Sequence, residues 1–220
     1  IMKRNILKKI KSIWDIENAF YLYSKPSRVS KTISHYEIFK KSLNIKGVII
    51  ECGVFKGTSL IKFLTFRDLL NKKKKRVFGF DAFGSFPNQK LKKDNKFSKY
   101  HDKIAGYGSP IEDLNKNLKN KKFKNFKLIK GNIKDTIPKF LKNNKKLKIS
   151  FLHLDLDVFE PTIAALNFFY KYVSKNGIIL LDDYNMIDGA TKAINQFKKK
   201  QKLKFHNLKF NRKLKYFIKK

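Results

Sequence analysis

The sequence predicts an α/β fold: a doubly wound, mostly parallel sheet with helices on both faces and an antiparallel hairpin at the C-terminus. The first observation is that short apolar runs alternate along the chain with helical segments, which is typical of a parallel sheet. The second is that these runs are continuously apolar, as in strands that are buried on both faces. The third is that 220 residues, of which 42% are hydrophobic, suffice for one sizeable core.

Five apolar runs predict the strands of this sheet. They lie at 48–50, 77–80, 126–129, 149–154 and 178–181. The intervening patterns predict helices at 59–70, 136–141, 161–173 and 187–199. We expect Asn176 and Gly177 to cap the C-terminal end of the third of these helices. The segments 202–209 and 213–219 predict the closing hairpin.

The chain before this alternation predicts a pair of N-terminal helices over residues 1–45, followed by the main domain at 46–220. The second of these helices is predicted at 30–42. On the first, one helical face gathers Ile6, Ile10, Ile13, Trp14 and Phe20. We expect it to pack on the body, where the pair would cap the substrate or an oligomer interface. The alternative is a basic helix that lies on an anionic membrane.

Residues 82–125 do not fit the alternation of strands and helices. They are polar and contain several glycines and prolines, yet they are too long for a bare loop. We predict that this insertion is an active-site lid with one short helix near 111–118.

The chain has a formal net charge of +35, but only 5 of its 52 basic residues are Arg, the side chain that best reads bases and phosphates. Residue types encoded by AT-rich codons dominate the composition, so codon bias explains much of the lysine content. The positive charge therefore does not favour a nucleic-acid partner. Attraction to an anionic substrate or membrane face stays open. The single cysteine, Cys52, excludes a disulfide framework and a cysteine-based zinc site. With no apolar run long enough to span a bilayer, we expect a cytoplasmic protein, free or at the inner face of the membrane.

Acidic residues are scarce in this chain, yet several follow the predicted strands directly. These residues are Glu51, Asp81, Asp155, Asp157, Asp182 and Asp183. In an open parallel sheet, ligands bind at the carboxyl ends of the strands. Clustered carboxylates repel one another, so we expect a cation among them: a metal ion, a cationic cofactor, or both.

The first predicted turn, Glu51-x-Gly53-x-x-x-Gly57, is rich in glycine but matches neither the dinucleotide fingerprint nor a P-loop. Its leading carboxylate suits a ligand with positive charge, such as S-adenosylmethionine. A plain strand–turn–helix junction is the alternative. Asp81 ends the second strand, where carboxylates accept hydrogen bonds from ribose hydroxyls, although an N-cap or exposed turn would also fit.

The segment after the fourth strand carries the strongest local pattern. Asp155 and Asp157 are two residues apart, so both carboxylates point the same way if the strand stays extended. Asp182 and Asp183 arrive beside them from the neighbouring strand. Such an oxygen-only site suits Mg²⁺, Ca²⁺ or Mn²⁺ and is poor for zinc. His153 is interpreted as a core histidine.

At these residues the sequence resembles the macrocin O-methyltransferase family, metal-dependent enzymes that methylate sugar hydroxyls with S-adenosylmethionine. The resemblance covers residues 30–190. It rests on Glu51-Cys52-Gly53-Val54-Phe55-Lys56-Gly57, Phe80-Asp81-x-Phe83-x-x-Phe86-Pro87, His153-x-Asp155-x-Asp157-x-Phe159-x-x-Thr162 and Asp182-Asp183-Tyr184. Phe159 departs from the usual tyrosine and Thr58 from a second glycine, and neither position supplies a metal ligand.

The resemblance implies a Rossmann-like methyltransferase domain and assigns roles to the residues of the motifs. It implies that Asp155 is the general base. The implied ligands of Mg²⁺ are Asp157, Asp182 and Asp183. The implied cofactor-binding residues are Glu51, Gly53, Val54, Gly57, Thr58, Asp81, Gly131 and Asp155.

We therefore expect transfer of a methyl group from S-adenosylmethionine to a hydroxyl, foremost of a sugar in glycan or natural-product biosynthesis. A catechol-type small-molecule O-methyltransferase is the alternative, and a nucleic-acid methyltransferase is less favoured. The acceptor is a small-molecule sugar or one linked to a nucleotide or lipid. Its phosphates could meet lid lysines that are otherwise simply solvated, namely Lys90, Lys92, Lys93, Lys96 and Lys99. Peripheral membrane association and a homo-oligomer also stay open.

Overall fold

The centre of the molecule is a seven-stranded sheet with the order β3-β2-β1-β4-β5-β7-β6, in a computed structural model that describes residues 11–220. The strands are β1 (Val48–Cys52), β2 (Val77–Asp81), β3 (Phe126–Lys130), β4 (Ile149–Leu154), β5 (Val173–Leu181), β6 (His206–Asn207) and β7 (Lys215–Ile218). Strands β1 to β5 are parallel, and β7 pairs antiparallel with β5 and β6. This topology confirms the predicted doubly wound sheet with a C-terminal hairpin.

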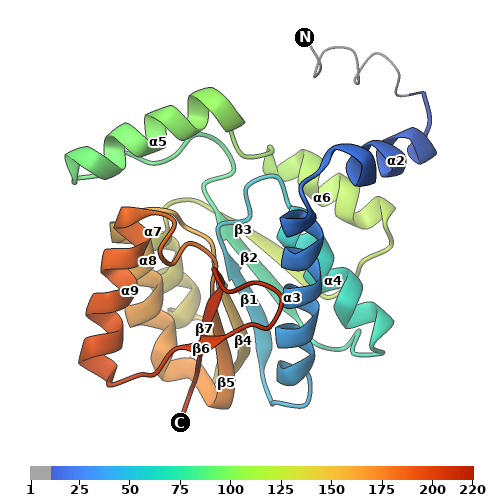
Figure 1. Ribbon diagram of the computed structural model, residues 1–220. Coiled ribbons are helices and arrows are strands. Elements are labelled where there is room, and N and C mark those ends of the chain that lie inside the picture. The colour runs from blue at the N-terminus through green and yellow to red at the C-terminus, as the bar shows by residue number, and fades with distance from the viewer. Residues whose placement is uncertain (1–10) are drawn as a thin grey trace.

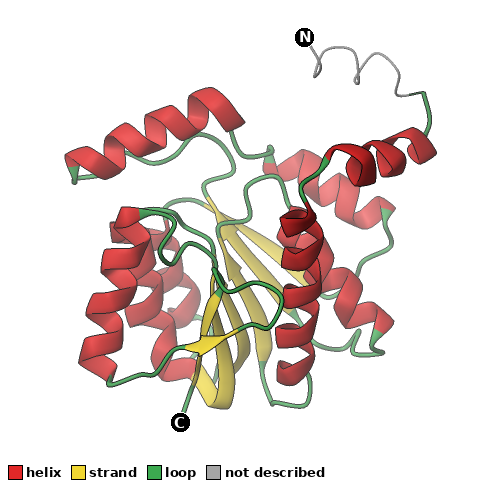
Figure 2. Cartoon of the chain, in the orientation of Figure 1, coloured by secondary structure: helices red, strands yellow, loops and turns green. Residues whose placement is uncertain are grey.

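Helices cover both faces of the sheet, as predicted (Figures 1 and 2). They are α2 (Ile13–Tyr23), α3 (Pro26–Ser42), α4 (Thr58–Leu69), α5 (Lys92–Ala105), α6 (Ile111–Asn120), α7 (Ile133–Lys142), α8 (Phe159–Phe169), the 3₁₀ helix η1 (Tyr170–Tyr172) and α9 (Asp188–Gln201). Helices α3, α4 and α6 pack on one face of the sheet, and α7, α8 and α9 pack on the other.

The side chains of β4 show how the two faces are built. Leu152 and Leu154 point into the core under α7 to α9, whereas Phe151 points to the opposite face. There the Phe151 ring lies 5.3 Å from Phe39 of α3 and 5.1 Å from Phe63 of α4. Edge-to-face aromatic packing of this kind stabilises beyond the buried area alone. Helix α3 is therefore part of the core that positions the strand ends.

The connection between α8 and β5 differs from the prediction. Helix α8 ends at Phe169, and after η1 the strand β5 already begins at Val173. Asn176 therefore lies inside β5 with φ of 64°, close to the point where the register between β4 and β5 shifts. Asparagine tolerates this left-handed backbone better than most residues. The predicted helix cap at Asn176 and Gly177 is wrong.

The insertion at 82–125 holds more helix than predicted. Besides α6, it contains the 14-residue helix α5, which the sequence interpretation missed. Asp94 in the first turn of α5 is buried, and its Oδ2 accepts a hydrogen bond of 2.7 Å from the Phe159 N–H. This bond ties the start of α5 to the start of α8.

Helix α2 projects away from the sheet (Figure 1), and none of its residues is buried. Trp14 is 70% exposed and Leu22 75% exposed. The expectation that this helix packs on the body is wrong for the described residues, and Ile6 and Ile10 lie outside them. In the part of the chain that the structure describes, no helix is long and apolar enough to cross a membrane. Contact of α2 with a lipid surface or a second copy stays a prediction.

Trp14 provides a direct test of this arrangement because it is the single tryptophan of the chain. We expect acrylamide to quench its fluorescence in dilute protein nearly as well as it quenches free tryptophan. Strong shielding at every protein concentration would contradict a projecting α2. Shielding that grows with protein concentration would instead show that a second copy covers the helix.

Candidate active site

A cavity of about 360 Å³ lies at the carboxyl ends of the central strands. Residues predicted from the sequence that line it are Gly53, Val54, Thr58, Asp81, Gly131, Asp155 and Asp157. Other described residues that were predicted for the site do not line the cavity, namely Glu51, Gly57, Asp182 and Asp183. The volume is within the range of small-molecule sites in proteins.

Asp81 organises the turn that follows β1. Its Oδ2 accepts hydrogen bonds from the N–H groups of Val54 at 2.8 Å and Phe55 at 2.9 Å, and its Oδ1 accepts from Phe83 at 2.7 Å. Phe55 and Phe83 have φ of 52° and 50°, a left-handed conformation that is rare for bulky residues. A carboxylate has about four acceptor sites, so Asp81 can still accept a hydrogen bond from a ribose hydroxyl.

The glycines of this turn are required by close contacts. Gly53 has φ of 90°, and a Cβ there would overlap the carbonyl oxygen of Asp155. Gly57 has φ of 84° at the start of α4, and a Cβ would lie 2.6 Å from Cδ1 of Leu114. The motif therefore lets the chain pass directly against the end of β4 and against α6.

Glu51 points away from the cavity. It is opposite His153 in the β1–β4 register, and its Oε1 lies 3.0 Å from Nδ1 of that histidine. Both side chains are fully buried. Burial opposes the charged form of His153, but contacts with Asp182 and Glu51 raise its pKa to about 9. Glu51 thus holds a charged core histidine, and any effect on a cofactor would be indirect.

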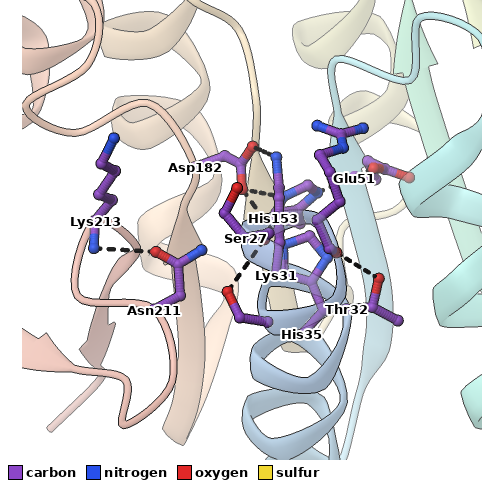
Figure 3. Close-up of polar contacts among 11 residues, drawn as sticks. Ser27, Lys31, Thr32, His35, Glu51, His153, Asp182, Asn211 and Lys213 are labelled. Atoms are coloured by element: carbon purple, nitrogen blue, oxygen red, sulfur yellow. Dashed lines mark hydrogen bonds and ion pairs between the residues drawn. The ribbon is translucent and has the colours of Figure 1, made fainter. Parts of the chain in front are cut away.

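Asp182 completes this buried network (Figure 3). It pairs with Lys31 of α3, and its Oδ1 lies 3.4 Å from Nε2 of His35 and 3.8 Å from Nε2 of His153. Burial alone would raise the pKa of Asp182, but the two histidines and Lys31 hold it well below its ordinary value. Burial lowers the pKa of His35 to about 4, so this ring is neutral. The cations Lys31 and His153 therefore match the anions Asp182 and Glu51.

A second set of carboxylates has no such match. Asp155, Asp157 and Asp183 each offer an oxygen within 4.8 Å of the others. Burial and neighbouring carboxylates raise the pKa of Asp155 well above its ordinary value and that of Asp183 to about 8. Among residues 11–220, none of the three has a cationic hydrogen-bond partner. Lys31 and His101 offset part of their charge without forming an ion pair with them. Three crowded oxygen donors without a directly paired cation fit a hard divalent cation.

This grouping differs from the one implied by the resemblance. The structure gathers Asp155 with Asp157 and Asp183, whereas Asp182 faces Lys31 and the histidines. The physical reason is that Lys31 and the charged His153 attract the Asp182 carboxylate away from the other three. The roles of all four aspartates stay predictions.

Several residues that line the cavity were not predicted from the sequence. They are Arg28, Lys31, His35, Phe55, Lys56, Ser59, Lys62, Phe86, His101 and Lys134. His101 of α5 lies 5.2 Å from the rings of Phe55 and Phe86, so the insertion does border the cavity. The five lid lysines considered above are exposed and do not line it. No motif marks the cationic residues of α3 and α4, so spacing could not have identified them.

The sequence of residues 35–218 matches the family model described as Macrocin-O-methyltransferase (TylF). The chain belongs to the macrocin O-methyltransferase family. A curated relative of this family member is demethyldecarbamoylnovobiocin O-methyltransferase of Streptomyces niveus, 24% identical over 162 residues. That alignment covers 71% of this chain but only 60% of the relative's length.

Solved structures share the fold of this macrocin O-methyltransferase family member. A calicheamicin methyltransferase superposes with a TM-score of 0.78 at 21% identity, covering 98% of this chain and 89% of the other. The O-methyltransferase NovP superposes with a TM-score of 0.76 at 20% identity, with 87% and 80% covered. A structure described as a TDP-rhamnose 3′-O-methyltransferase of calicheamicin biosynthesis has a TM-score of 0.70 at 20% identity, with 99% and 90% covered.

Two glycines that line the cavity test the close packing of the first turn. We expect Gly53→Ala to lower the free energy of unfolding by about 1–3 kcal/mol, because the new Cβ would overlap Asp155 and the backbone is left-handed. Gly84→Ala is the matched control, since a Cβ there has nothing within 4 Å. It should change stability by no more than about 0.5 kcal/mol. Urea unfolding measures the free energy of unfolding of both variants. Equal losses of stability in the two variants would contradict the packing argument.

Proposed function

We propose that this macrocin O-methyltransferase family member transfers the methyl group of S-adenosylmethionine to a hydroxyl of a sugar in natural-product or glycan biosynthesis. The observation that carries the proposal is the unmatched cluster of Asp155, Asp157 and Asp183 beside a cavity lined by the glycine turn and Asp81. The names of the relatives, which include a novobiocin-type and a TDP-rhamnose methyltransferase, support a sugar-bearing acceptor.

The carboxylate cluster fits Mg²⁺, because its donors are all oxygens and none of them is directly paired with a cation of the described residues. Asp157 and Asp183 would hold the ion, with Asp155 beside it. Asp182 would become a further ligand of the ion only if its ion pair with Lys31 broke. When bound, Mg²⁺ supplies positive charge that makes a nearby hydroxyl more acidic.

Asp155 is suited to take the proton from the acceptor hydroxyl, because it is buried and its pKa is raised well above the ordinary value. As Asp155 accepts this proton, the hydroxyl oxygen bonds to the methyl carbon, and the electrons of the broken S–C bond stay on sulfur. The Gly53 turn orients the donor for in-line displacement. Phe55, Phe86 and His101 border the cavity and limit the access of water.

Removal of the metal is the first test. We expect EDTA to abolish turnover and Mg²⁺ to restore it. Asp157→Asn should weaken metal binding, measured by calorimetry, whereas Asp155→Asn should keep the metal and lose about 10²- to 10⁴-fold in rate. Asp113→Asn, an exposed position on α6, is the control. Full activity in excess EDTA would overturn the metal-dependent mechanism.

The acceptor class needs a separate test. We expect mass-detected methyl transfer to nucleotide-linked sugars or glycosides in preference to catechols. Methylation of catechols alone would favour the alternative activity, a catechol-type O-methyltransferase. If the acceptor were a nucleic acid, the protein should bind nucleic acid with an affinity that falls steeply as the salt concentration rises. A gel shift at physiological salt tests whether such binding occurs.

A further inference from the structure

One end of the cavity carries positive charge that the proposed mechanism does not use. We propose that Arg28 and Lys62, beside the Lys31–Asp182 pair, form the binding site for the carboxylate at the amino-acid end of the methyl donor. The inference rests on the proposed function, and it assigns these residues as specificity-determining contacts outside the sequence motifs.

The three side chains come from two helices that pack together. Arg28 and Lys31 lie about one turn apart on α3, and Lys62 lies one turn after Thr58 on α4. All three line the cavity. Lys62 is half-buried, and its pKa is lowered by burial and then by the charges of Lys31 and Arg28. The three positive charges therefore oppose one another at this end of the cavity.

Other cations of the cavity already have partners. Lys56 donates to the carbonyl oxygen of Ala105 at 2.5 Å, and Lys134 pairs with Glu160 at 2.5 Å. Lys31 pairs with Asp182. Among the residues that the structure describes, the side chains of Arg28 and Lys62 have no hydrogen-bond or ion-pair partner. An anion between them would relieve the repulsion and pair both charges.

The order of the strands places the amino-acid end of the donor here. Gly131 follows β3, Asp81 ends β2 and Gly53 follows β1, and neighbouring strands lie about 4.8 Å apart. A donor with its ribose at Asp81 and its sulfonium near Gly53 extends past β1 toward the end of β4, where α3 packs beside α4. Its carboxylate then meets the cations, while its ammonium stays near Asp155.

The start of α4 adds a second favourable element. The helix begins after Gly57, and Thr58 and Ser59 of its first turn line the cavity. Backbone N–H groups at a helix start are free to donate, and the helix dipole is positive there. Together with Lys62 one turn later, these groups make an anion site from both backbone and side-chain donors.

A pair of ligands that differ only in the amino-acid end tests the assignment. S-adenosylhomocysteine carries the carboxylate, and 5′-methylthioadenosine lacks the whole amino-acid end. We expect Lys62→Gln and Arg28→Gln each to lower the affinity for S-adenosylhomocysteine about 10-fold in calorimetric titration. The affinity for 5′-methylthioadenosine should stay unchanged. Lys62→Arg should retain most of the affinity. Lys40→Gln, exposed on α3, is the matched control, and circular dichroism verifies that each variant folds.

The opposite results separate the two hypotheses. Unchanged affinity for S-adenosylhomocysteine in both Gln variants, with normal binding by the wild type, overturns only this inference. If the same variants instead lose affinity for thymidine diphosphate, the cations serve a phosphate of the acceptor, which also overturns it. A wild-type protein that binds no S-adenosylhomocysteine overturns the proposed function together with the inference.

Discussion

Repulsion among six carboxylates at the carboxyl edge of the sheet has to be offset within a small volume that is largely removed from water. The chain does so unevenly. The Asp81 carboxylate accepts hydrogen bonds from three backbone N–H groups. Glu51 pairs with His153, and Asp182 pairs with Lys31. The remaining carboxylates, on Asp155, Asp157 and Asp183, form no ion pair with a cation of the described residues, and only the more distant charges of Lys31 and His101 offset them in part. A direct ion pair is thus missing at one defined point among the described residues, and Asp155 and Asp157 place that point at the cavity.

The matched network also explains why α3 belongs to the site. Lys31 and His35 lie one turn apart on α3 and both reach Asp182, while Phe39 one turn later is fixed against Phe63. The packing of the aromatic core thus sets the position of the ion pair. Loss of Lys31 would leave Asp182 as an additional buried charge beside the unmatched cluster, which is strongly unfavourable. The same helix turn carries Arg28, so one element both neutralises the strand end and lines the cavity.

Much of this arrangement could be predicted, and the exceptions have physical causes. Buried strands are recognisable because their apolar runs are continuous, and the acids after them converge because parallel strands end at one edge. The direction of Glu51 could not be predicted, since it depends on the β1–β4 register that places it opposite His153. Helix α5 was missed because its many lysines resemble a solvated loop. The separation of Asp182 from Asp183 depends on Lys31, which lies 151 positions away in the sequence.

The lysine content itself can now be interpreted by position. The lid lysines are exposed, where an added lysine costs little, so biased codon usage suffices to explain them. Lys62 is different, because a half-buried ammonium beside two other cations loses hydration and gains repulsion. Composition alone does not favour a lysine at such a place, and a shorter apolar side chain would avoid both costs. Asp182 and Glu51 offset this cost only in part, because the pKa of Lys62 is still lowered. A cation that is unfavourable in the free protein is consistent with a binding residue, because a bound anion would supply the missing compensation.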